Sequence, residues 1–178
     1  PVVTAKFDGV ADAPAWRYDA TRPEAGMNVR WGITPNLTLN GTVNPDFSQV
    51  ESDAGQFSFD PRLALFFPEK RPFFLDSIEQ FSTPNNLIYT RAVVQPLGAV
   101  KLAGKAAGND LAVLLAEDAA SASASRADHP LFAVLRMQHD LGKQSRIGMA
   151  YTDRADGANW NRVLDVDGRL VWNTINTF

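Results

Sequence analysis

Apolar and polar residues alternate strictly through residues 27–43, which read MNVRWGITPNLTLNGTV. Apolar side chains occupy every second position from Met27 to Ile33, and the pattern resumes from Leu37 to Val43. A period of two is typical of β-strands whose two faces meet different surroundings. Between the halves, Pro35 cannot donate a backbone hydrogen bond and Asn36 tolerates a positive φ, so the stretch predicts a tight hairpin.

The same alternation returns after residue 97 and continues to the end of the chain. It predicts strands over residues 98–105, 111–115, 131–138, 146–152 and 160–172, with turns at residues 108–110 and 141–143. Short turns and longer loops alternate along this series. The predicted fold is therefore all-β, an antiparallel up-and-down meander within a single β domain over residues 1–178.

Residues 44–97 break the pattern. They hold six of the eleven prolines and eight of the eleven phenylalanines, so long helices are excluded. Leu87, Tyr89 and Arg91 suggest one short strand. We expect an ordered Pro/Phe-rich insertion, because a connection of this length is normally functional or packed by its own side chains.

Composition excludes several classes of protein. The net charge of −3, with no basic stripe interleaved with aromatics, argues against nucleic-acid binding. The absence of cysteine excludes disulfides and thiolate metal sites. No apolar run approaches the roughly 18 residues of a membrane helix. Because the chain begins Pro1-Val2, we interpret it as an excised or processed piece.

The alternation fits two architectures, a soluble β-sandwich and a membrane β-barrel. Strand lengths near ten residues, the alternation of turn lengths, and aromatics near strand ends favour the barrel. Its lipid-facing residues would be Leu131, Leu135, Met137, Ile147, Met149, Leu164 and Leu170. Its polar lumen would be lined by Arg30, Lys101, Arg136, Arg146 and Arg169 and partly filled by the insertion.

Three segments resemble one bacterial family, domain of unknown function 5916. They are residues 31–39 (WGITPNLTL), 44–51 (NPDFSQVE) and 65–75 (LFFPEKRPFFL). The resemblance implies an exported Gram-negative protein with an N-terminal domain similar to family-9 carbohydrate-binding modules, followed by an outer-membrane β-barrel. This chain would be the first part of that barrel domain, a fragment with an open sheet edge.

The chain departs from the family pattern at two places. The family has a Glu-Gly pair where this chain has Asp76-Ser77, and a second arginine where it has Ala92. Any functional role carried over to those positions is therefore in doubt.

Two acidic or charged groups are candidate sites in the insertion. Asp46, Glu51 and Asp53 offer oxygen ligands for calcium, but their spacing does not match an EF-hand loop, and loop carboxylates that cap backbone amides or pair with arginines are the favoured interpretation. Glu69, Lys70 and Arg71 lie between two Phe-Phe pairs, where they either pack the insertion or form a charged ledge in a lumen. Further ligand or lumen candidates are Arg91, Arg136, Arg146 and Arg169.

The sequence therefore predicts a non-enzymatic outer-membrane β-barrel fragment for transport or surface handling of polysaccharide or other polar solutes. Outer-membrane lipid would be its partner, and no cofactor is expected. The alternative is a soluble periplasmic or extracellular β-domain that binds carbohydrate through exposed aromatics. A third reading is a glycoside hydrolase with carboxylates drawn from Asp46, Glu51, Asp53, Glu69 and Glu79.

Overall fold

The computed structural model describes residues 2–4, 7–12, 15–20, 24–45, 68–173 and 176–177, with side chains over 26–45 and 68–171. Asp46, Glu51 and Asp53 lie outside these residues, so the calcium prediction stays a prediction.

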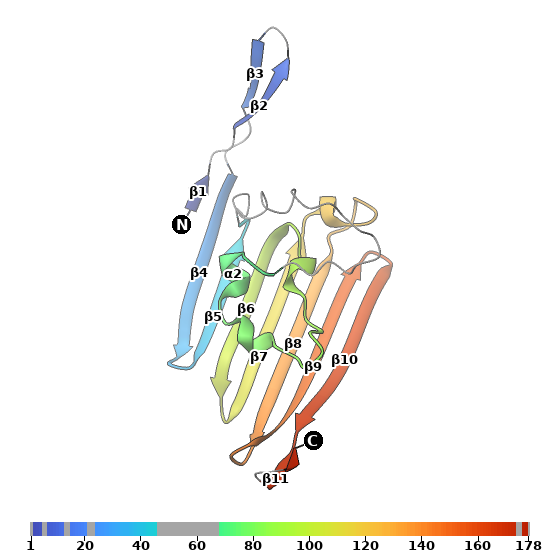
Figure 1. Cartoon of the computed structure of the whole chain (residues 1–178). Coiled ribbons are helices and arrows are strands. Elements are labelled where there is room, and N and C mark those ends of the chain that lie inside the picture. Colours follow the sequence, from blue (N-terminus) through green and yellow to red (C-terminus); the bar gives the residue numbers. More distant parts are fainter. Residues whose placement is uncertain are drawn as a thin grey trace.

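One antiparallel sheet dominates the fold, as Figure 1 shows. Its seven main strands follow one another in chain order, and each pairs with the next. They are β4 (Glu24–Thr34), β5 (Leu37–Val43), β6 (Pro96–Ala106), β7 (Asn109–Asp118), β8 (Leu131–Leu141), β9 (Ser145–Asp156) and β10 (Asn159–Arg169). The predicted all-β antiparallel meander is confirmed.

Short ladders flank the sheet. β1 (Val2–Thr4) pairs with the start of β4, whereas β2 (Phe7–Asp12) and β3 (Ala15–Ala20) form a hairpin of their own. The sequence analysis did not predict these three strands. β11 (Val171–Asn173) pairs with β12 (Asn176–Thr177), so the prediction of one continuous strand over residues 160–172 is wrong.

The break after β10 has a local cause. β9 begins at Ser145, so the ladder partners of β10 end at Arg169, which lies opposite Arg146. The Ser145 hydroxyl accepts a hydrogen bond from the Val171 N–H at 2.9 Å and donates one to the Val171 carbonyl at 3.2 Å. A side chain thus replaces the backbone partner that the next ladder step would need.

Tight turns close one end of the sheet. The turn between β6 and β7 is formed by Ala107 and Gly108, whose φ angles of 50° and 78° suit a two-residue hairpin. The sequence prediction placed this turn one residue too late. Nearby, Gly104 has a φ of 143°, and a Cβ there would lie 2.0 Å from the Asn36 carbonyl oxygen, so only glycine fits.

The described part of the insertion, residues 68–95, lies across one face of the sheet, and we call it the cover (Figure 1). It contains α2 (Pro72–Leu75) and the 3₁₀-helices η2 (Ile78–Phe81) and η3 (Thr90–Ala92). The predicted strand around Tyr89 is wrong. The Ala92 and Val93 N–H groups bond back to the carbonyls of Tyr89 and Thr90 and close a 3₁₀ turn instead.

The hydrophobic core lies between the cover and the sheet. Large side chains come mainly from the cover, and small ones mainly from the strands, which lets the cover approach closely. The members are Phe74, Phe81, Val93, Ala99, Ala103, Ala112, Leu114, Ala116 and Phe132.

The opposite face of the sheet is apolar and exposed. The register places on it alternate residues of every strand from β4 to β10. Its exposed members include Met27, Val29, Trp31, Val43, Val100, Leu115, Leu131, Met137, Ile147, Met149, Trp160, Leu164 and Val166. In the part of the chain that the structure describes, no element packs against this face.

Candidate functional site on the polar face

Charged side chains gather on the covered face of the sheet. The register brings Arg30, Lys101, Arg136 and Asp167 to this face because they occupy the positions that alternate with the apolar set. Lys101 and Arg136 are each only 1% exposed. Buried charges need partners, and the cover supplies most of them.

A buried ion pair organises the start of the cover. The Glu69 carboxylate accepts hydrogen bonds from Arg71 Nε and Nη2, each at 2.8 Å, and from the Thr90 hydroxyl at 2.6 Å. Arg71 also donates to the carbonyls of Val93 and Thr90 and lies 4.1 Å from the Phe74 ring centroid. Residues 69–71 are thereby tied to residues 90–93, and we call this group the clasp.

The clasp controls the protonation of Glu69. Burial raises the pKa of this carboxyl, but hydrogen bonds from Arg71 and Thr90 outweigh it and lower the pKa to about 2. Both side chains are 3% exposed. The pair therefore stays ionised at neutral pH within the interior of the cover.

Lys101 and Asp76 fasten the middle of the cover to the sheet. The Lys101 ammonium donates to the backbone carbonyls of Phe73 and Asp76, at the end of α2. The Asp76 carboxylate accepts a hydrogen bond from Asn40 at 2.6 Å and lies 3.4 Å from Arg30. The orphan carbonyls of a short helix thus receive a cation from the sheet.

Arg136 crosses a neighbouring strand to reach its partner. It extends from β8 over Gly148 of β9 and makes a two-pronged ion pair with Asp167 of β10, with Nη2 at 3.0 Å from Oδ1. Its Nε donates to the Ser82 carbonyl of the cover at 3.1 Å. A Cβ on Gly148 would lie 2.8 Å from both terminal nitrogens, so glycine leaves the space that the guanidinium occupies.

Two aspartates hold the longer connections. Asp118 accepts hydrogen bonds from the N–H groups of Val94 and Gln95, at 2.8 and 3.1 Å. Asp156 accepts one from the Ser123 hydroxyl at 2.5 Å and one from the Ala124 N–H at 3.2 Å. The loop between β7 and β8 is therefore bound to the sheet.

A polar pocket of about 330 Å³ lies between the cover and the ends of β8, β9 and β10. It is lined by Glu79, Ser82, Thr83, Pro84, Arg136, Gln138, Arg146, Asp167, Gly168 and Arg169. Three of the arginines predicted as ligand or lumen residues thus meet at one place. This pocket is our candidate functional site.

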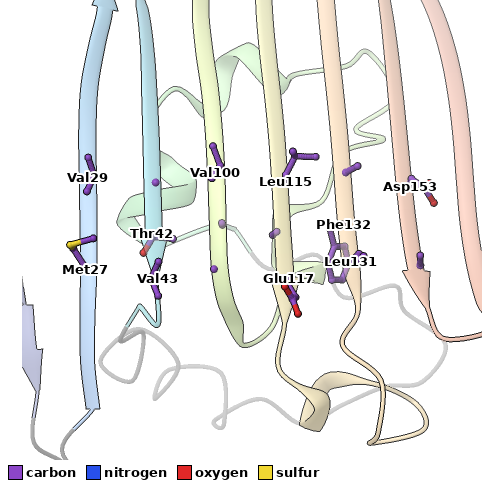
Figure 2. A pocket seen from close by; sticks show the side chains of 16 residues that line it. Met27, Val29, Thr42, Val43, Val100, Leu115, Glu117, Leu131, Phe132 and Asp153 are labelled. Carbon is purple, nitrogen blue, oxygen red and sulfur yellow. The ribbon is translucent and has the colours of Figure 1, made fainter.

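A second, apolar hollow of about 660 Å³ lies on the exposed face. Figure 2 shows Met27, Val29, Val100 and Leu115, which line it from β4, β6 and β7. Glu117 and Asp153 are the acidic residues that line it. A predominantly aliphatic hollow provides few hydrogen-bonding groups to orient a polar ligand.

A family model described as a domain of unknown function, DUF5916, matches residues 9–110, more than half of the chain. The chain belongs to the DUF5916 family. Comparison with curated proteins and with solved structures gave no match. The DUF5916 match begins within β2, covers β3 to β6 and the cover, and ends within β7.

The other predicted site residues that the structure describes lie in or beside the clasp. Glu69 and Arg71 meet in the clasp, and Arg91 lines a neighbouring cavity of about 260 Å³ that also includes Glu69. Lys70 is exposed beside them. In the described ranges, no cluster of three or more His, Cys, Asp and Glu side chains is arranged to hold a metal ion.

Sequence reasoning missed Thr90, Asp118, Asp156 and Asp167. Asp167 had a usable signal, because it shares its face with Arg169, two residues later. The others depend on pairings between segments distant in the chain, which periodicity does not reveal.

The structure gives residues 76 and 77 distinct roles in the cover. Asp76 bonds Asn40, so an acid at this position ties the cover to β5. Ser77 has a φ of 57°, in the left-handed region that favours glycine.

Proposed function

We propose that this DUF5916 chain forms a sector of an outer-membrane β-barrel, with its apolar face toward lipid and its polar face toward a lumen that contains the cover. One observation carries the proposal. On the charged face, Lys101 and Arg136 are buried beneath the cover, whereas the face bearing Trp31, Leu164 and Val166 is open, at 63–66% exposure for these side chains. A water-soluble domain buries its apolar face instead.

Strand geometry supports this proposal. β6 to β10 contain 10 to 12 residues each, which suits strands that cross a bilayer at a tilt. Short turns close one end, after β4, β6 and β8, while the long connections after β5 and β7 lie at the other, together with the short turn after β9. In bacterial barrels the short turns face the periplasm.

The distribution of polar residues on the apolar face gives further support. Glu117, Asp153 and Arg162 lie toward the end with the long connections, and Asp153 accepts a hydrogen bond from Arg162 at 3.0 Å. Asn109 and His139 lie at the end with the short turns. Between these two groups the outward residues are apolar, as a lipid-facing band requires.

The proposal requires additional strands along both edges of the sheet. Among the described residues, β10 pairs on one side only, and β1 covers only the beginning of β4. Unpaired backbone groups are too costly to leave in hydrocarbon, so a barrel must close. No helix in the described part of the chain is long and apolar enough to cross a membrane.

The role that fits this arrangement is non-enzymatic passage or surface handling of polysaccharide or other polar solutes. Support comes from the polar pocket, whose arginines, Gln138 and hydroxyl residues face the proposed lumen. Charged and hydrogen-bonding side chains in a lumen select solutes.

Carbohydrate binding by a soluble domain has weaker support. Trp31 and Trp160 are well exposed, but they lie on β4 and β10, far apart in the strand order and among aliphatic side chains. Hydrolysis has less support still. Of the acids considered, Glu69 is fully engaged by Arg71 and Thr90, and Asp46, Glu51 and Asp53 lie outside the described residues.

Fractionation tests the proposal. The full-length protein is expressed in a Gram-negative host, membranes are separated, and gel migration in detergent is compared before and after heating. We expect the protein in the outer-membrane fraction, with a folded form that changes its migration on heating. A soluble periplasmic protein would reverse the assignment of the apolar face and favour carbohydrate binding.

A further inference from the structure

Two arginines lie directly opposite each other in the polar pocket. Arg146 of β9 and Arg169 of β10 are register partners on the polar face, and both are exposed. Like charges in this position destabilise an antiparallel pair. Among the described ion pairs, none includes either arginine.

Two of the nearest acids are already paired with other cations. Asp140, the register partner of Arg146 on β8, bonds the Lys105 ammonium at 3.0 Å. Asp167, two residues before Arg169, is held by the two-pronged pair with Arg136. Glu79 lines the pocket from the cover. Neither Arg146 nor Arg169 forms an ion pair with any of these three carboxylates.

The surroundings suit a small solute with an anionic group. Ser82, Thr83 and Gln138 line the pocket and offer hydrogen bonds to hydroxyl groups. Its volume of about 330 Å³ is at the lower end of typical ligand pockets. Guanidinium groups bind carboxylate and other oxyanions through paired, charge-assisted hydrogen bonds.

We propose that Arg146 and Arg169 form an anion site that binds the carboxylate, or an equivalent oxyanion group, of a polar solute. The anion site itself does not depend on the proposed barrel. Only the passage of the solute through a lumen rests on that proposed function. An oxyanion between the two arginines neutralises their mutual repulsion. Polar neighbours then contact the rest of the solute.

Calorimetric titration of the full-length purified protein with D-glucuronate and D-glucose tests the site, because these probes differ by one carboxylate. We expect glucuronate to bind at least tenfold more tightly than glucose, with affinity that falls as sodium chloride is raised. Arg146→Gln and Arg169→Gln should each weaken glucuronate binding about tenfold.

Arg154→Gln is the matched control, since Arg154 is an exposed arginine on the same face of β9, close to Asp156 at the other end of the strand. It should leave glucuronate affinity unchanged. Equal affinity for the two probes, or an equal loss in Arg154→Gln, would overturn the anion site, the latter because net charge alone would then explain binding.

A stability measurement guards against misfolded variants. Replacing both arginines with glutamine removes a like-charge contact, so the double variant should unfold at a temperature no lower than that of the original protein. A clear fall in that temperature would contradict the repulsion on which the site is built.

The anion site and the proposed barrel can be contradicted independently of each other. A soluble protein that binds glucuronate would overturn only the barrel, and an outer-membrane protein that does not bind it would overturn only the anion site.

Discussion

The two faces of this sheet reverse the usual relation between polarity and burial. The polar face carries Lys101 and Arg136 at 1% exposure beneath the cover, while the apolar face carries Trp160 and Leu164 at 66%. The polar face is held by ion pairs and hydrogen bonds to one connecting segment. The contrast teaches that, among the described residues, this chain covers charged side chains with its own connecting segment and leaves large apolar side chains uncovered.

The largest effect should come from breaking the clasp. Arg71→Met leaves the Glu69 carboxylate buried without its cation, which should lower the free energy of unfolding by about 3 to 5 kcal/mol. Urea titration in detergent measures this change. Lys70→Met, at the adjacent exposed position, should change it by less than about 0.5 kcal/mol. Equal losses in both variants would mean that the clasp does not hold the cover.

A charge midway along the apolar side of β10 tests the proposed contact of this face with lipid. Leu164→Arg should oppose membrane insertion by about 2 to 4 kcal/mol at the bilayer midplane. Asn161→Arg, on the same strand but on the polar face, should insert normally. Insertion is followed by heat-modifiable migration in outer-membrane fractions. Normal insertion of Leu164→Arg would mean that the apolar face does not contact lipid at this depth.

At low pH, protonation of Glu69 should weaken the clasp and lower the free energy of unfolding. Its pKa is about 2 in the folded protein and 4.5 in the reference state, so the stabilisation is fully present above pH 4.5 and is lost as the pH falls towards 2. The expected loss is on the order of 3 kcal/mol. Unfolding measured across this range should show the slope, and Glu69→Gln should flatten it. An unchanged slope in Glu69→Gln would assign the effect to other carboxyls.

Gly148 on the polar face and Gly41 on the apolar face differ in the room that each leaves for an added methyl group. Gly148→Ala places a methyl group against the Arg136–Asp167 pair and should cost about 1 to 3 kcal/mol. Gly41→Ala meets no atom within 4 Å and should be neutral or slightly stabilising. Thermal unfolding of the two variants compares them directly. A neutral Gly148→Ala would show that Arg136 moves freely.

The smallest effect concerns Ser77, one of two residues of the cover with a left-handed φ. Ser77→Gly should raise the free energy of unfolding by up to about 1 kcal/mol, because glycine adopts a φ of 57° without steric cost. Ser82→Gly, at a φ of −65°, should lower it slightly. A loss in both variants would show that Ser77 contributes through its side chain.

Periodicity predicted the sheet because each strand from Met27 onward separates apolar from polar positions. It also placed Arg136, Arg146 and Arg169 on one face, which the structure brings to one pocket. Strands β1 to β3 were missed because they are short, although Trp16 and Tyr18 alternate with Arg17 and Asp19 within β3. The cover was misread at Tyr89 because residues 90–93 are held by hydrogen bonds with Glu69 and Arg71, much earlier in the chain, which a local pattern does not contain.

The reach of Arg136 over Gly148 also bears on how β8, β9 and β10 assemble. A slip of β9 by one residue would bring Ile147 or Met149 to the crossing point, and a slip by two would bring Arg146 or Ala150. Each of these side chains would obstruct the guanidinium or repel it. One glycine and one ion pair thus act together as a check on strand registration while the sheet forms.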